Sequence, residues 1–224
     1  MKESRSSIRP LKPKDFQKLT KASDSAVDNF KTYLDLLRHW QSKINLVGAS
    51  TLEDPWWRHF LDCAQLYPLL AKQARVIVDV GSGAGFPALV LAILDVDQHD
   101  SKQRDQREYH LIESNKRKCI FLREINRLVG LPVVVHDLRA ENYSGPLADI
   151  VTARACASLN ALLALSAPLM KRDGRGLFLK GAKYRDELTL AKKDWKMSVK
   201  RRASETNSKS VILQVENLVR IDGI

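Results

Sequence analysis

The sequence predicts an α/β fold with a doubly wound, mostly parallel seven-stranded sheet that ends in an antiparallel edge hairpin. The first observation is the alternation of apolar runs of strand length with helical segments from residue 75 onward. The second is a glycine-rich turn, GSGAG, directly after the first of these strands, where open parallel sheets bind ligands. The third is a pair of strand-like segments around SETNSK, which predicts the closing hairpin.

The segment before the sheet divides into a tail and a helical extension. Residues 1–22 are polar and basic, with two prolines, and predict a flexible tail. Residues 23–72 predict helices, and INLVGAS separates the first from the second. The second begins with Asp54 as its N-cap and Pro55 at its first position. The first of these two helices has apolar residues at helical spacing, namely Val27, Phe30, Leu34, Leu37 and Trp40.

Residues 73–224 predict the sheet domain, in which strands and helices alternate. A polar segment over 95–108 predicts an insertion that forms a solvated loop. Helices are expected over 87–94, 115–130 and 157–170, and Gly130 suits the end of the second. Strands are expected over 75–80, 109–114, 132–137, 148–155 and 175–181, with the hairpin over 195–203 and 210–221.

Length and charge restrict the class of protein and its partners. The chain has 224 residues, which suits one domain or one domain with a small appendage. Lys and Arg number 37 against 26 Asp and Glu, and the net charge of +11 favours a polyanionic partner. The alternative is a soluble protein that happens to be basic. No apolar run reaches the roughly 18 residues of a membrane span, and the N-terminal segment lacks the apolar region of a secretory signal.

Three cysteines, Cys63, Cys119 and Cys156, lie far apart in apolar surroundings. They match neither a disulfide framework nor the spacing of metal ligands, and the five histidines add no metal pattern. We therefore expect reduced core cysteines, no metal site and a cytoplasmic protein.

The glycine turn after the first strand differs from two common nucleotide sites. A dinucleotide-binding turn needs a third glycine where this chain has Phe86, and no Gly-Lys-Ser/Thr of a P-loop follows. The pattern is instead Asp79-x-Gly81-x-Gly83-x-Gly85. It resembles the first motif of the class I methyltransferases that bind S-adenosylmethionine, and the alternative is a plain tight turn.

Acidic residues after the next two strands fit the same cofactor. Class I methyltransferases carry an acidic residue at the end of the second strand, which holds both ribose hydroxyls, and Glu113 stands there. In that superfamily the loop after the third strand meets the adenine amino group, and here it reads HDLRAENY. The alternative is a solvated helix start with Asp137 as its cap, and both interpretations stay open.

A set of further motifs, taken in order along the chain, resembles one family. They are INLVG, RHFLDC, VDVGSGAGFPALVLAI, LIESNKRKCIFLREI, RAENY, ARACASLNALL and FLKG, and they cover about residues 44–181. The set resembles the RsmG (GidB) family, bacterial methyltransferases that modify N7 of a guanine in 16S ribosomal RNA. The resemblance implies a Rossmann-like class I methyltransferase domain over residues 73–224, with S-adenosylmethionine as its cofactor.

The resemblance also assigns individual residues. It implies cofactor contacts at Gly81, Phe86, Ala140, Glu141 and Arg154, beside the Asp79, Gly83, Gly85 and Glu113 of the cofactor motif. Phe86, Cys156 and Cys63 stand where many relatives have leucine, phenylalanine and serine. We interpret His59 and Asp62 as a pair on one helix face that positions the N-terminal helices on the core.

Methylation at N7 of guanine makes few chemical demands. N7 carries a free in-plane lone pair and loses no proton on attack, so alignment in a matched pocket suffices. Consistently, TARACASL has no Asn/Asp-Pro-Pro-Tyr loop of the kind that grips exocyclic amines. Arg154 is the expected catalytic residue, holding guanine O6, a phosphate or the cofactor carboxylate while N7 stays free. The alternative for Arg154 is a structural salt bridge.

The expected partner is 16S ribosomal RNA or the small ribosomal subunit, bound by a monomer. Lys180, Arg201 and Arg202 are expected to contact the RNA backbone. Two other functions stay open. A class I methyltransferase for a small molecule or a protein would share the glycine turn without needing the charge of +11. A non-catalytic RNA-binding protein with the same fold would bind no cofactor.

Overall fold

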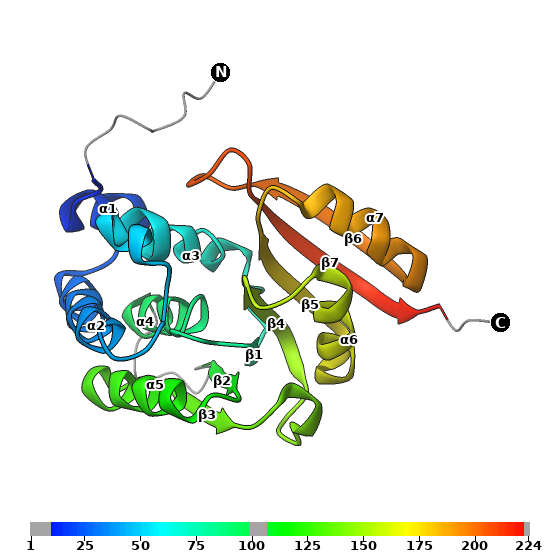
Figure 1. The fold of residues 1–224 in the computed structure, drawn as a ribbon, viewed down its shortest axis with the longest axis horizontal. Coiled ribbons are helices and arrows are strands. Elements are labelled where there is room, and N and C mark those ends of the chain that lie inside the picture. Colours follow the sequence, from blue (N-terminus) through cyan, green and yellow to red (C-terminus); the bar gives the residue numbers. More distant parts are fainter. Residues whose placement is uncertain (1–9, 99–106, 222–224) are drawn as a thin grey trace.

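The computed structural model describes residues 10–98 and 107–221, which form one seven-stranded sheet between two layers of helices (Figure 1). The strand order is β3-β2-β1-β4-β5-β7-β6, in which β7 is antiparallel to both neighbours and the other pairs are parallel. The strands are β1 (Val76–Val80), β2 (Glu108–Glu113), β3 (Val133–Asp137), β4 (Ala148–Arg154), β5 (Met170–Lys180), β6 (Trp195–Ala203) and β7 (Val211–Arg220).

Helices precede the sheet and connect its strands. The longer ones are α1 (Pro13–Thr20), α2 (Asp24–Gln41), α4 (Ala88–Gln98), α5 (Lys116–Val129), α6 (Leu159–Ser166) and α7 (Tyr184–Asp194). The short ones are η1 (Ala49–Glu53), the π-helix η2 (Trp56–Leu61), α3 (Asp62–Ala64), η3 (Tyr67–Leu69), η4 (Ala140–Asn142) and η5 (Ala167–Leu169). In the described part of the chain, no helix combines the length and apolarity needed to cross a membrane.

An apolar core lies on each face of the sheet. Helices α1, α2, α4 and α5 share one core, in which Phe30, Leu89 and Phe121 are fully buried. Helices α6 and α7 cover the other face, where Leu163 and Phe178 are fully buried (Figure 1). This arrangement confirms the predicted doubly wound sheet with its antiparallel edge. The division between an extension over 23–72 and a domain over 73–224 stays a prediction, because side chains of both segments share the first core.

Capping residues explain where several helices begin and end. Helix α2 follows Ser23, whose Oγ accepts a hydrogen bond from the Ala26 N–H at 3.1 Å. Helix α5 follows Asn115, whose side chain caps its first turn, and ends at Gly130 with φ 71°. Asp54 accepts from the Trp57 N–H at 3.4 Å, as an N-cap does, although the helix that follows begins as π-helix.

The prediction of a flexible tail over residues 1–22 is wrong for its second half. Residues 13–20 form helix α1, and the Phe16 side chain is fully buried. Its ring lies 5.0 Å from that of Phe30 and 5.3 Å from that of Trp56, centroid to centroid. A single buried aromatic side chain anchors this helix, and most of its other residues are polar. The sequence pattern therefore does not indicate a packed helix. Residues 1–9 lie outside the described residues.

The predicted loop over 95–108 is wrong at both of its ends. Helix α4 continues to Gln98, and strand β2 begins at Glu108. Asp95 and Arg107 are 2% and 5% exposed and form a buried ion pair. These two charged residues neutralise each other inside the protein, which a polar sequence pattern does not predict. The part over 99–106 lies outside the described residues.

Candidate active site

A cavity of about 990 Å³ opens at the carboxyl ends of the parallel strands. Its lining includes the glycine turn after β1, Glu113 at the end of β2, and residues 154–156, which begin with the last residue of β4. The lining also includes residues 45–49 and 58–59 of the N-terminal helical layer and residues 206–207 of the β6–β7 loop. The cavity therefore combines the predicted cofactor turn with residues from segments distant in sequence.

The backbone of the turn explains its glycines. Gly81, Gly83 and Gly85 have φ values of 66°, 57° and 89°, a region that glycine adopts without strain. A Cβ on Gly81 would lie 2.7 Å from Cβ of Cys156, and one on Gly85 would lie 2.4 Å from a methyl of Leu89. At Gly83, which lines the cavity, the nearest atom would be 3.8 Å away, so that backbone faces open space.

Glu113 lies where the sequence predicts it, at the end of β2 and in the cavity wall. One carboxylate oxygen accepts a hydrogen bond from the Gly83 N–H at 2.9 Å, and the other accepts from the Asn115 N–H at 2.8 Å. Each oxygen retains a lone pair for another donor. Glu113 thus fixes the glycine turn and can still accept hydrogen bonds from a molecule in the cavity.

Asp79 lies beneath the turn rather than in the cavity wall. Its carboxyl is 1% exposed, and Oδ1 accepts a hydrogen bond from the Thr152 hydroxyl at 2.6 Å. Oδ2 has no hydrogen-bond partner within the described residues. Burial raises the pKa of Asp79 to about 7, although the hydrogen bond from Thr152 opposes the shift. The structure places the Asp79 carboxyl in a position that supports the turn, and a direct contact with a cofactor stays a prediction.

Ala140 and Glu141 lie in the short helix η4 after β3 and do not line this cavity. Glu141 is exposed, and Ala140 is half-buried. Their edge of the sheet is nevertheless that of the cofactor turn, because β2 and β3 are parallel and Glu113 pairs in register with Asp137. An adenine contact at these two residues stays a prediction.

Phe86 connects the turn to the N-terminal helical layer. Its ring stacks on the His59 imidazole at 4.8 Å and on the Tyr33 ring at 5.3 Å, centroid to centroid. The Arg154 guanidinium carbon lies 4.5 Å from the centre of the Phe86 ring. The Tyr33 hydroxyl donates to the carbonyl of Ala84. The helical layer therefore holds the turn from one side, and no sequence motif reveals the part that Tyr33 plays in this.

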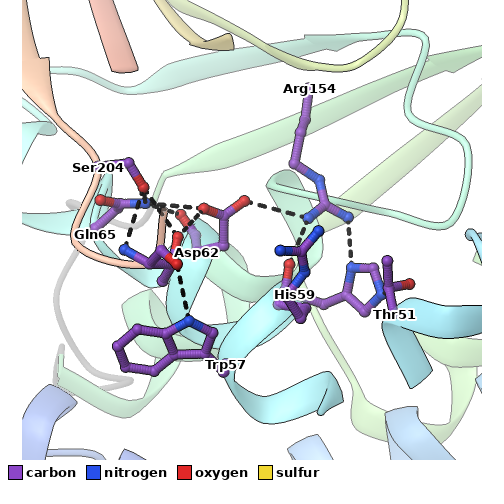
Figure 2. Close-up of polar contacts among 9 residues, drawn as sticks. Thr51, Trp57, His59, Asp62, Gln65, Arg154 and Ser204 are labelled. Atoms are coloured by element: carbon purple, nitrogen blue, oxygen red, sulfur yellow. Dashed lines mark hydrogen bonds and ion pairs between the residues drawn. The ribbon is translucent and has the colours of Figure 1, made fainter. Parts of the chain in front are cut away.

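Arg154 extends from the end of β4 to both members of the predicted helix-face pair, as Figure 2 shows. Its Nη2 donates to His59 Nδ1 at 2.9 Å, and its Nη1 lies 3.4 Å from Asp62 Oδ2. The same Nη1 donates to the carbonyl of Arg58 at 3.2 Å. His59 and Asp62 therefore connect the N-terminal helices to the core, and they do so by binding Arg154.

His59 is neutral in this arrangement. Burial, with the positive charges of Arg154 and Arg58, lowers the pKa of His59 to about 3. Because a guanidinium only donates, Nδ1 is the acceptor and the ring proton is on Nε2. Nε2 donates to the Thr51 hydroxyl at 2.7 Å, and that hydroxyl donates to the Gly48 carbonyl at 2.6 Å.

The remaining predicted residues divide between the cavity and the surface. Lys180 lines the cavity but is 7% exposed, and its ammonium binds Glu187 at 2.6 Å and the Ala157 carbonyl at 2.8 Å. A contact between Lys180 and an RNA backbone stays a prediction. Arg201 and Arg202 are exposed on the edge strand β6, outside the cavity. Cys156, expected in the core, is exposed in the cavity wall, whereas Cys63 and Cys119 are buried.

Comparison with solved structures identifies the fold. A putative O-methyltransferase from Klebsiella pneumoniae superposes with a TM-score of 0.58 at 12% identity, covering 92% of this chain and 96% of that one. The O-methyltransferase TomG from Streptomyces achromogenes, solved in complex with SAM, superposes with a TM-score of 0.55 at 12% identity, covering 90% and 93%. Similarity at this level of identity is a similarity of fold.

Comparison with known sequences identifies the family. The family described as GidB, rRNA small subunit methyltransferase G, matches residues 26–215. The protein named Ribosomal RNA small subunit methyltransferase G in Rhodospirillum centenum is 47% identical over 204 residues, 91% of this chain and 90% of its own length. Its namesake in Rhodospirillum rubrum is 44% identical over 210 residues, 94% and 100% of the two chains. The predicted class of S-adenosylmethionine-dependent methyltransferase is confirmed, and this chain belongs to the rRNA small subunit methyltransferase G family.

Proposed function

We propose that this protein transfers a methyl group from S-adenosylmethionine to N7 of one guanine in 16S ribosomal RNA. The observation that carries the proposal is the cavity, which is lined by the glycine turn and Glu113 together with residues of the N-terminal helices and the β6–β7 loop. Membership of the rRNA small subunit methyltransferase G family supports the RNA substrate. N7 of guanine as the target rests on the resemblance of the sequence motifs.

The turn fits the cofactor because its glycine at position 83 leaves space that a side chain would fill. The space beside Gly83 is open, and the carboxylate of Glu113 retains lone pairs for the two ribose hydroxyls. Gly81, Gly83, Phe86, Glu113 and Arg154 all line the cavity and would hold the cofactor. When bound, S-adenosylmethionine supplies an electrophilic methyl group on its sulfonium.

The cavity needs no general base for this reaction. The guanine N7 lone pair lies in the plane of the base and carries no proton to remove. His59 is neutral, and its Nδ1 already accepts from Arg154. Asp62 also binds Arg154. These residues therefore contribute by aligning N7 with the methyl group in a pocket of matched charge.

Arg154 provides that alignment through donors that its protein partners leave free. A guanidinium has five N–H donors, and within the described residues Arg154 uses two on Nη1 and one on Nη2. The Nε–H and the second Nη2–H are left for a cofactor carboxylate or for guanine O6. Arg154 thus acts on the reacting groups while it is itself held by an ion pair with Asp62.

Unpaired cations at the cavity suit the RNA backbone. Arg58 is exposed, Lys118 is half-buried, both line the cavity, and neither forms an ion pair within the described residues. By contrast, Arg154 and Lys180 are paired with Asp62 and Glu187. Arg58 and Lys118 are therefore available for phosphates next to the target nucleotide, and Arg201 and Arg202 for phosphates further away. A monomer in the cytoplasm remains our expectation.

The experiment that tests the function is a map of N7-methylguanine in 16S ribosomal RNA from cells with and without the gene. Chemical cleavage at N7-methylguanine should stop reverse transcription at one position in RNA from normal cells. That stop should disappear when the gene is deleted and return when it is restored. An unchanged pattern of stops after deletion would reject the proposed function.

A further inference from the structure

His59 has an environment that suits one protonation state and one orientation. The imidazole is 4% exposed and stacks on Phe86 with an angle of 14° between the ring planes. Both ring nitrogens are used, since Nδ1 accepts from Arg154 at 2.9 Å and Nε2 donates to Thr51 at 2.7 Å. A ring that is stacked and hydrogen-bonded at both nitrogens cannot rotate without breaking all three interactions.

These bonds form one directional chain from the backbone of the cavity wall to the arginine. The Gly48 carbonyl accepts from Thr51, the Thr51 hydroxyl accepts from His59, and Nδ1 of His59 accepts from Arg154. Gly48, Thr51 and His59 come from the N-terminal helical layer, whereas Phe86 follows the glycine turn and Arg154 ends β4, and all five line the cavity. Figure 2 shows the arginine reaching between His59 and Asp62. The chain of bonds therefore connects the N-terminal helical layer to the end of β4 within the lining of the cavity.

We propose that His59 is a positioning residue for methyl transfer, which fixes the Arg154 guanidinium beside the cofactor turn and couples it to the cavity wall at Thr51. The inference rests on the proposed function and adds a residue to it. Arg154 has a long side chain, and its bonds to Asp62 and to the Arg58 carbonyl both involve Nη1, so they hold one end of the guanidinium. The bond to His59 at Nη2 holds the other end of the guanidinium.

We assign the positioning role to His59 because the acceptors around Arg154 bind different nitrogens of its guanidinium. Nη2 of Arg154 has one partner within the described residues, and that partner is His59. The Arg58 carbonyl and Asp62 both bind Nη1. Removing the acceptor at His59 thus releases one end of the guanidinium while its bonds at Nη1 remain.

The test compares two substitutions of nearly equal size, His59→Asn and His59→Leu. Both remove the stacking on Phe86 and the bond to Thr51. Asn keeps an acceptor oxygen close to the position of Nδ1, and Leu places a methyl group there. The measurements are cofactor affinity by calorimetry and single-turnover methyl transfer to small ribosomal subunits at saturating cofactor. A thermal unfolding curve for each variant checks that both are folded.

We expect the Leu variant to be at least about tenfold slower than the Asn variant, the range for a missing hydrogen bond to a charged group. Equal rates for two folded variants would overturn the proposal, because both substitutions would lower the rate equally if His59 had only a structural role. Thr51→Val, which keeps the bond to Arg154, should lie between the unmodified protein and His59→Leu. A Thr51→Val rate equal to that of the unmodified protein would overturn the coupling to the cavity wall.

Failure of the proposed function would give a different result. In that case the unmodified protein would bind S-adenosylmethionine but label no ribosomal RNA. Cofactor affinity alone would then test the positioning of Arg154, since Arg154 lines the same cavity as the glycine turn. A tenfold weaker affinity for His59→Leu than for His59→Asn supports the proposal, and equal affinities overturn it.

Discussion

Among single residues, Gly83 offers the sharpest test of the cofactor site. It has φ 57°, lines the cavity, and would place an added Cβ no closer than 3.8 Å to another atom. Gly130 at the end of α5 has φ 71° and no neighbour within 4 Å of such a Cβ. The two glycines therefore differ in their distance from the site and not in the strain that a side chain would cause.

Gly83→Ala should weaken the binding of S-adenosylmethionine at least about tenfold, because the new methyl group occupies space that the ligand needs. Gly130→Ala should leave that affinity unchanged. Both should lower stability by roughly 1–2 kcal/mol, the usual cost of a left-handed residue with a Cβ. Calorimetry with thermal unfolding checks both points. Equal affinities for the two variants would remove Gly83 from the cofactor site.

Asp79 makes stability depend on pH in a direction opposite to that of most carboxyls. Its pKa is raised to about 7 in the folded protein, so the folded state binds more protons than the unfolded state between about pH 4 and 7. Its contribution to stability is present below about pH 4 and is lost as pH rises through about 7. His59, with its pKa lowered to about 3, acts in the other direction, losing stability as pH falls below about 6.5.

Asp79→Asn separates the two groups, because Asn keeps an acceptor for Thr152 and does not ionise. The free energy of unfolding of this variant should exceed that of the unmodified protein by an amount that grows between about pH 4 and 7. The difference should be on the order of a few kcal/mol, since one pKa unit corresponds to about 1.4 kcal/mol. Denaturant titrations at several pH values measure it. A difference that does not change with pH would contradict the raised pKa.

Among the elements, helix α1 carries the clearest energetic prediction. Phe16 is fully buried among Phe30, Trp56 and Phe60, whereas Leu19 on the same helix is 61% exposed. Phe16→Ala should lower the free energy of unfolding by about 3–5 kcal/mol. Leu19→Ala should change it by no more than about 0.5 kcal/mol. If both substitutions had the same small effect, α1 would not be part of the core.

The elements that could be predicted from the sequence are those whose own residues carry the pattern. Strands β1 and β2 are apolar runs, and α5 has both an N-cap and a C-terminal glycine. Helix α7 was not predicted, because only Leu188 and Ala191 of its residues are buried. The short helix α1 depends on Phe16 alone, and the ends of the 95–108 segment depend on a pair of charges brought together by the fold.

Part of the candidate site could likewise be predicted from the sequence, and part could not. The glycine turn and Glu113 could be predicted, because both lie at strand ends on one edge of a parallel sheet. The bond between Arg154 and His59 joins residues 95 positions apart, and that between Asp62 and Thr206 spans 144. No periodicity encodes such pairings. Arg154 and His59 can therefore be identified separately from the sequence, and the structure supplies their connection.

At the scale of the whole molecule, RNA binding and chemistry depend on different residues. A net charge of +11 implies binding that weakens steeply with salt, through many phosphate contacts. Arg154→Ala should lower the single-turnover rate at saturating RNA by about a hundredfold and leave the salt dependence of binding unchanged. Arg201→Glu together with Arg202→Glu should do the reverse, reducing the salt slope by about 0.7–0.9 for each phosphate that is no longer bound.

Filter binding over a range of salt concentrations, with rapid-quench methyl transfer for the same variants, makes this comparison. A rate for Arg154→Ala equal to that of the unmodified protein would make Arg154 a purely structural ion pair. An unchanged salt slope for the double variant would remove this part of β6 from the RNA interface. The two results are independent, because Arg154 lines the cavity and Arg201 and Arg202 do not.

The central claim is that one cavity brings S-adenosylmethionine to N7 of a guanine in 16S ribosomal RNA. The most direct measurement supplies the purified protein with S-adenosylmethionine labelled on the methyl group and small ribosomal subunits from cells that lack the gene. The RNA is then digested to nucleosides, which are separated and identified by mass. We predict label in 7-methylguanosine alone, approaching one per 16S molecule. Label in any other nucleoside, or none in RNA, would contradict the claim.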